Sequence, residues 1–271
     1  VELPEDTLTD RIWDAEAIAL ARPDSGNPFA YAPVKLLAGA TDESIPFLVD
    51  SASRRRFAAD PARVALVLRA PGGGWELAGQ GEAEIGRFVG RALAQETAWS
   101  DEAHDRDRAA AFRAMRAHDN AMLRKLALTE MVPMPYAQVR QTEVALPVDW
   151  LSDRLVDPGW YGWQPVLVTL LGLHPDPAAR DIVRARALTV RPEDRAPWLV
   201  ALIEADGEAG IARTLGDSQD GAAVRAAIRA LATHAGATPE HAPAIAAALV
   251  RLVSDHPGLA AEAVPGLAAL G

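Results

Sequence analysis

The chain has 271 residues, 49% of them hydrophobic and 24% charged, which suits one large globular domain or two ordinary ones. Its formal net charge of -10 repels phosphate backbones and disfavours nucleic acid as a partner. The absence of cysteine excludes disulfides, zinc–thiolate sites and thiol catalysis.

The chain begins at Val1 and not at a methionine, as removal of a signal peptide or a truncation would leave it. We therefore expect a periplasmic or secreted protein. The longest apolar run, Val166 to Leu173, is far shorter than the roughly 18 residues of a membrane span. No membrane span is expected.

Residues 1–80 are expected to form a small β-barrel-like domain. Short apolar runs over 15–21, 29–37 and 45–49 are separated by turn-forming residues. Between Arg63 and Gln80, apolar residues alternate on both sides of a glycine-rich break, which predicts a β-hairpin. Several short strands at such spacing are typical of a small barrel.

Residues 81–271 are expected to form an all-α domain, since the apolar spacing changes to that of helices near residue 82. The C-terminal part, 221–271, is rich in alanine, which favours helices and lets them pack closely. Ala-Ala pairs begin at 178, 222 and 260, about one period of a HEAT-type helical hairpin apart. The predicted fold class is α+β, with a barrel-like domain followed by a HEAT-like array.

Two sets of short motifs carry a resemblance. The segments Asp14–Arg22 and Pro33–Gly39 resemble small exported bacterial β-barrel domains, which are distantly similar to OB-like and netrin-like modules. The later segments Asp119–Glu130, Trp150-Leu151 and Leu170–Gly172 resemble uncharacterised bacterial proteins that join such a barrel to HEAT-like helices. The resemblance implies the two-part architecture and no particular chemistry.

Motifs for catalysis or metal binding are missing. There is no nucleophile elbow, His-Glu-x-x-His, phosphate loop or dinucleotide fingerprint. His104 and His118 cannot share an ion, because fourteen residues of helix rise about 21 Å. A calcium loop from Asp217 would need an acidic residue where Ile228 stands. We expect a protein that is not an enzyme and binds no cofactor and no metal.

The segment Trp160-Tyr161-Gly162-Trp163 is the first candidate for a partner-binding site. Exposed Trp and Tyr rings bury much area at low entropic cost, as interface hot spots do. Carbohydrate stacking would use the same rings. The alternative is that the rings of Trp160, Tyr161 and Trp163 close the first layer of the helical array.

The cluster Arg54, Arg55 and Arg56 is the second candidate, since it is the densest run of cations. Consecutive helical residues point about 100° apart, so an anionic partner site competes with a solvated face. Trp75, beside the glycine-rich break that begins at Pro71, is the third candidate.

The predicted function is a non-catalytic, extracytoplasmic protein-binding or scaffold module, because helical arrays expose extended surfaces. Its partner is expected to be another protein or a peptide. Two alternatives stay open. One is an accessory or inhibitor protein that inserts the hairpin at Pro71–Trp75 into an enzyme. The other is a hydrolase or metal enzyme with an unrecognised site. The oligomeric state is open too.

Overall fold

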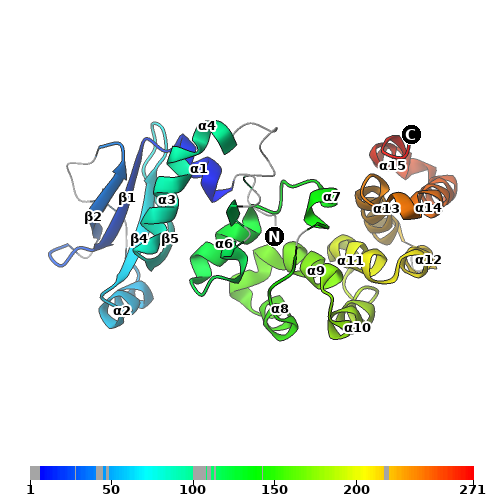
Figure 1. Ribbon diagram of the computed structural model, residues 1–271, viewed down its shortest axis with the longest axis horizontal. Coiled ribbons are helices and arrows are strands. Elements are labelled where there is room, and N and C mark those ends of the chain that lie inside the picture. Colours follow the sequence, from blue (N-terminus) through cyan, green and yellow to red (C-terminus); the bar gives the residue numbers. More distant parts are fainter. Residues whose placement is uncertain are drawn as a thin grey trace. The chain divides into compact units, whose positions relative to one another are not determined.

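The computed structural model describes residues 7–27, 29–40, 45–46, 49–99, 108, 111–112, 114–141, 143–216 and 220–271. All strands of the described residues end by Glu82, and the chain after them is helical, in agreement with the expected order. The chain divides into two compact units, with the border between Glu130 and Met131 (Figure 1). We call the described parts before and after this border the sheet unit and the helical unit.

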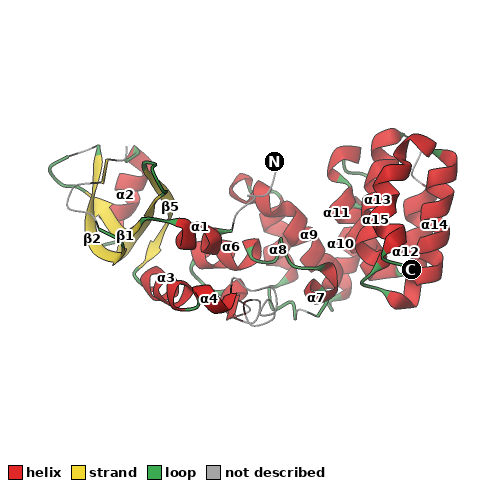
Figure 2. Ribbon diagram, turned by 90° about the horizontal axis from the view of Figure 1, so that it is seen from above, coloured by secondary structure: helices red, strands yellow, loops and turns green. Residues whose placement is uncertain are grey.

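The sheet unit is built on one curled antiparallel sheet. Its strands are β1 (Ala17–Pro23), β2 (Ala30–Ala38), β3 (Ile45–Pro46), β4 (Arg63–Arg69) and β5 (Trp75–Glu82), in the spatial order β3-β2-β1-β4-β5. The register shifts after Ile18 and Leu20 in β1 and after Leu66 in β4. Such irregularities bend strands, and the sheet curls into an open half-barrel in place of the expected barrel (Figure 2).

Helices accompany this sheet. They are α1 (Leu8–Asp14), α2 (Ser51–Ala59), α3 (Glu84–Ala94), α4 (Glu96–Trp99), the 3-10 turn η2 (Ala114–Ala117) and α6 (Ala121–Thr129). Successive side chains of a strand point to opposite faces, and both faces of β1 and β4 are buried. On one face Ile18 and Leu66 share a core with α1, α3 and α6. On the other face Ala19 and Val67 share a core with Phe57 of α2.

The expected domain border after residue 80 falls near the end of β5, just before α3 begins. The compact unit itself continues to Glu130. The reason lies in the core, because Phe88 of α3 and Leu126 of α6 are buried together with strand residues. Helices that follow the last strand therefore cover the sheet.

The helical unit consists of short helices joined by tight turns. They are α7 (Tyr136–Val139), α8 (Val148–Leu155), η3 (Pro158–Trp163), α9 (Gln164–Leu173), α10 (Pro177–Arg186), η4 (Pro192–Asp194), α11 (Ala196–Asp206), α12 (Glu208–Gly216), α13 (Gly221–Ala235), η5 (Pro239–His241), α14 (Ala242–Asp255), η6 (Pro257–Leu259) and α15 (Ala260–Ala268). Across the described residues, no helix combines the length and apolar character that crossing a bilayer requires.

Alternate helices of this unit form a row. Helix α9 packs on α11, α11 on α13 and α13 on α15, while α10, α12 and α14 pack against that row (Figures 1 and 2). Small residues allow the close approach. A Cβ atom on Gly172 would lie 2.7 Å from the Cα of Ala201, and one on Gly266 would lie 2.9 Å from the Cα of Ala232. Glycine at these crossings lets the backbones nearly touch.

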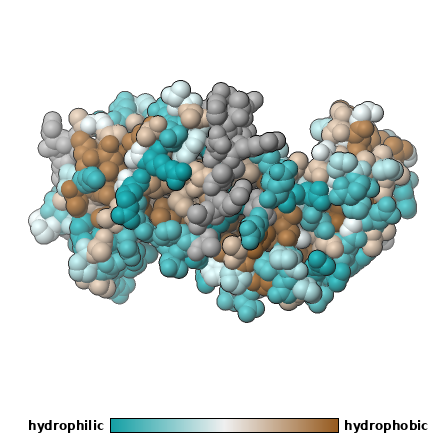
Figure 3. Space-filling view, viewed as in Figure 1, coloured by the Kyte–Doolittle hydropathy of each residue, from teal (hydrophilic) through white to brown (hydrophobic). Residues whose placement is uncertain are grey.

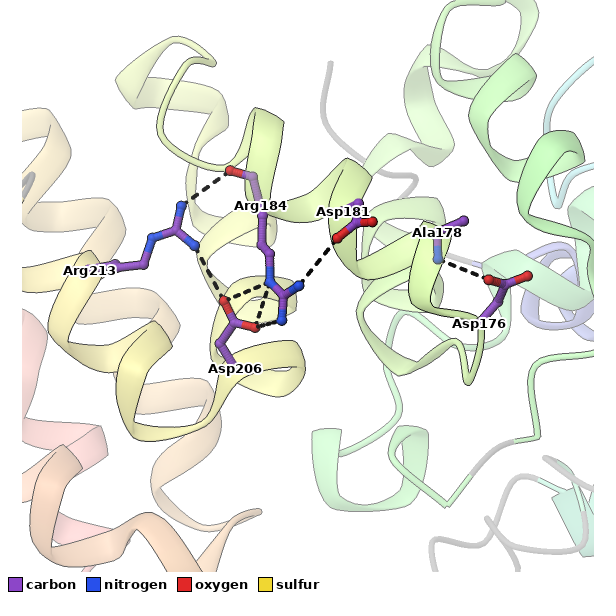
Figure 4. Close-up of polar contacts among 6 residues, drawn as sticks. All are labelled: Asp176, Ala178, Asp181, Arg184, Asp206 and Arg213. Carbon is purple, nitrogen blue, oxygen red and sulfur yellow. Dashed lines mark hydrogen bonds and ion pairs between the residues drawn. The ribbon is translucent and has the colours of Figure 1, made fainter.

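An ion network ties the ends of three helices together (Figure 4). Asp206, at the end of α11, accepts from Arg184 of α10 at 2.6 Å and from Arg213 of α12 at 3.3 Å. Arg213 also donates to the backbone carbonyl of Arg184. The Asp206 side chain is only 9% exposed, and the two guanidinium groups compensate its buried negative charge.

Candidate functional site

The predicted aromatic cluster is divided between core and surface. Trp160 is only 5% exposed, and its ring meets Trp150 edge-on at 5.1 Å and Trp163 at 5.9 Å between centroids. Trp163 is half-buried, whereas Tyr161 is 45% exposed. One turn of 3-10 helix therefore places Trp160 inside and leaves Tyr161 as the aromatic ring offered to solvent.

The predicted arginine cluster lies on α2. Asp50 caps this helix by accepting from the backbone N–H of Ser53 at 2.8 Å. The side chains of Arg54, Arg55 and Arg56 are exposed. Arg54 donates to the carbonyl of residue 49, and Arg56 donates to the hydroxyl of Ser53. Two of the three cations thus fold back on their own helix.

The hairpin between β4 and β5 is short. Trp75 is half-buried opposite Arg69, whose guanidinium lies 5.5 Å from the ring centroid. Gly72 has a φ of 64°, and its N–H donates to Glu16 at 3.2 Å. The turn is therefore exposed but bound to Glu16, which directly precedes β1.

A pocket of about 510 Å³ opens in the helical unit. Three helices of the row supply one side, and the segment Met131–Val139, which includes α7, supplies the other. The lining residues are Met131, Val132, Met134, Tyr136, Val139, Pro165, Val166, Thr169, Ala196, Pro197, Val200, Arg229 and Thr233. Most of these side chains are apolar. The size and character suit a ligand's hydrophobic group.

A second pocket of about 600 Å³ adjoins the first. It is lined by Tyr161, Gln164, Pro165, Val168, Arg191, Glu193, Asp194, Pro197, Trp198 and Arg229. The two pockets share Pro165, Pro197 and Arg229, so they lie side by side across α9, α11 and α13. We call the two adjoining pockets together the groove. It has an apolar half and a half in which Tyr161 lies among charged residues.

The wall segment of the groove is fixed by a polar network. The Tyr136 hydroxyl donates to Glu204 at 2.9 Å, and Arg140 donates to the same carboxylate at 2.9 Å. Arg140 also reaches the carbonyl of Ala237 at 2.7 Å and the carboxylate of Glu240 at 3.2 Å. α7 is thereby bound to α11 and to the turn after α13. The apolar pocket has a preorganised wall.

Burial controls the charge states beneath this wall. Desolvation, together with the charge of Glu204, raises the pKa of Tyr136 and keeps its phenol protonated. Desolvation lowers the pKa of His234, which is fully buried and whose ring packs edge-on against Tyr136 at 4.9 Å. His234 Nε2 lies 3.0 Å from the carbonyl of Val200, so a neutral imidazole with a proton on Nε2 fits there.

Charge is distributed unevenly along the groove. Arg191 pairs with Asp194 at 2.6 Å and with Glu193 at 3.5 Å, so one cation serves two carboxylates at η4 and one negative charge remains there. Arg229 is exposed on α13 and borders both pockets. Within the residues that the structure describes, Arg229 makes no ion pair. The junction of the two pockets therefore carries an exposed guanidinium group that forms no ion pair with the described residues.

Where the structure describes the chain, no group of three or more His, Asp or Glu side chains is placed to hold a metal ion. His104 and the segment 217–219 lie outside the described residues. The arrangement in the groove suits recognition of an apolar group beside a carboxylate. Comparisons with protein-family models, with curated proteins and with solved structures find no match.

Sequence reasoning located Tyr161 but missed most of the groove. The wall segment at Met131–Val139 and the cation Arg229 were not singled out. One signal was available, since Pro165 and Pro197 both stand in the first turn of a helix. They mark the starts of two neighbouring helices of the row, which is where the two pockets meet.

Proposed function

We propose that this chain is a non-catalytic protein-binding module whose groove takes an extended segment of a partner protein. The observation that carries the proposal is that the two pockets adjoin and share Pro165, Pro197 and Arg229. A groove that crosses three helices is long for a small metabolite but suits several successive residues of a peptide. Its fixed wall at Tyr136 reduces the entropic cost of binding.

The row of alternate helices supports a finer proposal about the fold. In a HEAT-like array, successive helical hairpins stack so that each packs on its neighbours and one layer forms a concave surface. The packing order α9, α11, α13 and α15 fits such stacking. We also retain the extracytoplasmic location as a proposal, resting on the resemblance to exported bacterial proteins. Fractionation of the native host tests that location.

Peptide selection tests the binding function. A random peptide display library is selected on the full chain and on Thr233→Trp, which places an indole in the apolar pocket that Thr233 lines. Thr189→Trp adds the same ring at an exposed position that lines neither pocket and serves as the matched control. Wild type and Thr189→Trp should enrich the same sequences, and Thr233→Trp should lose them.

Unchanged circular dichroism and thermal unfolding of Thr233→Trp would show that the loss of binding is local. If wild type enriches no sequence, or if Thr233→Trp retains the wild-type sequences, the groove is not the binding site. A hydrolytic or metal-dependent activity that survives Thr233→Trp would instead favour the alternative of a hydrolase or metal enzyme with an unrecognised site.

The hairpin alternative has weaker support. The turn at Gly72 is exposed, but it is short and bound to Glu16, so it offers little surface for insertion into a partner. A pocket bordered by Phe88 and Trp99 in the described part of the sheet unit has a volume of about 240 Å³, smaller than either pocket of the groove.

A further inference from the structure

We propose that the partner segment carries a bulky apolar side chain for the apolar pocket and, within a few residues, an internal Asp or Glu for Arg229. This inference deepens the proposed binding function and rests on it. It specifies the chemistry of the partner, namely an acidic and hydrophobic peptide segment.

The apolar half of the groove sets the first requirement. Val132, Val139, Val166 and Val200 line a pocket of about 510 Å³, which holds a Leu, Phe or Trp side chain with space to spare. Burying such a side chain removes its apolar surface from water and so favours binding. Met134 adds a flexible, polarisable wall that can adapt to more than one ring or branched chain.

Arg229 sets the second requirement. It borders the apolar pocket, so a carboxylate that reaches it lies close to the apolar anchor. The nearby acidic residues Glu193 and Asp194 are already paired with Arg191. Among the described residues no carboxylate forms an ion pair with Arg229. A ligand carboxylate would gain charge-assisted hydrogen bonds from its guanidinium group, whereas a ligand lysine would meet a group of like charge.

The second pocket indicates that the carboxylate is internal to the peptide. Beyond Arg229 the groove continues past Tyr161 and Trp198. A peptide that ended at Arg229 would leave this half empty. A chain that passes Arg229 can place further residues against the exposed ring of Tyr161, which contributes area at low entropic cost. We therefore assign the acidic group to a side chain and not to a chain terminus.

Selection with altered charge tests the inference. The same random peptide library is selected on the full chain and on Arg229→Glu, with Arg180→Gln as control because Arg180 is exposed on α10 and borders neither pocket. Wild type and Arg180→Gln should enrich Asp or Glu near an apolar residue. Arg229→Glu should enrich Lys or Arg at that position. The selected peptides should keep their apolar anchor in every case.

Fluorescence anisotropy then measures the effect on one selected peptide and on its Glu→Gln form. At low salt, wild type should bind the Gln form about five- to tenfold more weakly, and Arg229→Gln should bind both forms equally. The preference should shrink at high salt, because the charge pair is exposed.

The outcomes separate the two proposals. If peptides are selected and Thr233→Trp abolishes them, but Arg229→Glu keeps the acidic preference, the groove binds peptides and the inference about Arg229 is wrong. Enrichment of acidic groups only at the peptide C-terminus would overturn the internal placement. If no peptide is selected, or Thr233→Trp changes nothing, the proposed function itself fails.

Discussion

The sheet unit and the helical unit bury their apolar residues in different ways. In the sheet unit, strands β1 and β4 are covered on both faces, by α1, α3 and α6 on one and by α2 on the other. In the helical unit, one row of helices packs edge to edge through glycine and alanine, and part of its surface stays open as the groove. Covering a layer on both sides favours stability, whereas a row of helices that is covered only in part leaves a surface for ligands.

The largest loss of stability is expected when the helices of the row are forced apart. Gly172→Val places a side chain where the backbone of Ala201 lies within 2.7 Å, so α9 and α11 must move apart. We expect a loss of about 3 kcal/mol in the free energy of unfolding, at the upper end for overpacking. Urea unfolding followed by circular dichroism measures it.

Gly221→Ala is the control for this substitution, because a Cβ atom there has no neighbour within 4 Å. Its stability should stay close to that of wild type. An equally stable Gly172→Val would show that the two helices are not held at this crossing.

The ion pairs of two buried carboxylates, one in each unit, offer a second comparison. Breaking either pair should lower the free energy of unfolding by about 2 kcal/mol. Asp206→Asn leaves Arg184 and Arg213 without their shared carboxylate, although both guanidinium groups are partly exposed and screened by water. Glu130→Gln in the sheet unit breaks the pair with Arg108 at 2.7 Å. Hydrogen exchange should locate each loss of protection in the unit that was altered. Equal effects in both units would show that the units unfold together.

The pH dependence of stability should differ between the units because of His234. Its folded pKa is depressed by burial, so below its ordinary value of 6.5 the unfolded chain binds a proton that the folded chain excludes. The free energy of unfolding should then fall by up to about 1.4 kcal/mol per pH unit as the pH drops below 6.5.

Urea unfolding at about pH 7.5, 6.5 and 5.5, which bracket an ordinary histidine pKa, measures this slope. His234→Gln removes the titrating group and should flatten the curve in the helical unit. A variant that keeps the wild-type slope would assign the pH dependence to another group.

The smallest expected effect concerns the groove wall. Tyr136→Phe removes one hydrogen bond to Glu204 while Arg140 continues to bind that carboxylate. We expect a loss of about 1 kcal/mol in the free energy of unfolding and a few-fold weaker binding of a selected peptide. Calorimetric binding and urea unfolding measure the two effects. Weaker binding at unchanged stability would assign Tyr136 to ligand contact and not to support of the wall.

The strands and many helix starts could be predicted from the sequence because their signals are local. The alternation between Arg63 and Gln80 became β4 and β5, and Asp220 caps α13 by accepting from the N–H groups of Ala222 and Ala223. Such features depend on a few neighbouring residues. Alternation and capping are therefore legible without tertiary information.

The groove could not be predicted because its walls come from four separate segments. Apolar spacing within a helix indicates which face is buried but not where two helices leave a hollow between them. Arg229 reads in the sequence as one exposed residue among several on α13. The sequence also does not show which residues of η3 face the core, so Trp160 and Tyr161 could not be assigned to core and surface.

The clustered indoles of the helical unit have an optical consequence. Trp150 and Trp160 lie edge-on with ring centroids 5.1 Å apart, and Trp160 and Trp163 lie 5.9 Å apart. Fixed aromatic rings in such contact give a circular dichroism signal that depends on tight packing. Part of the near-ultraviolet circular dichroism of the protein should therefore report the packing of the helical unit, without any introduced label.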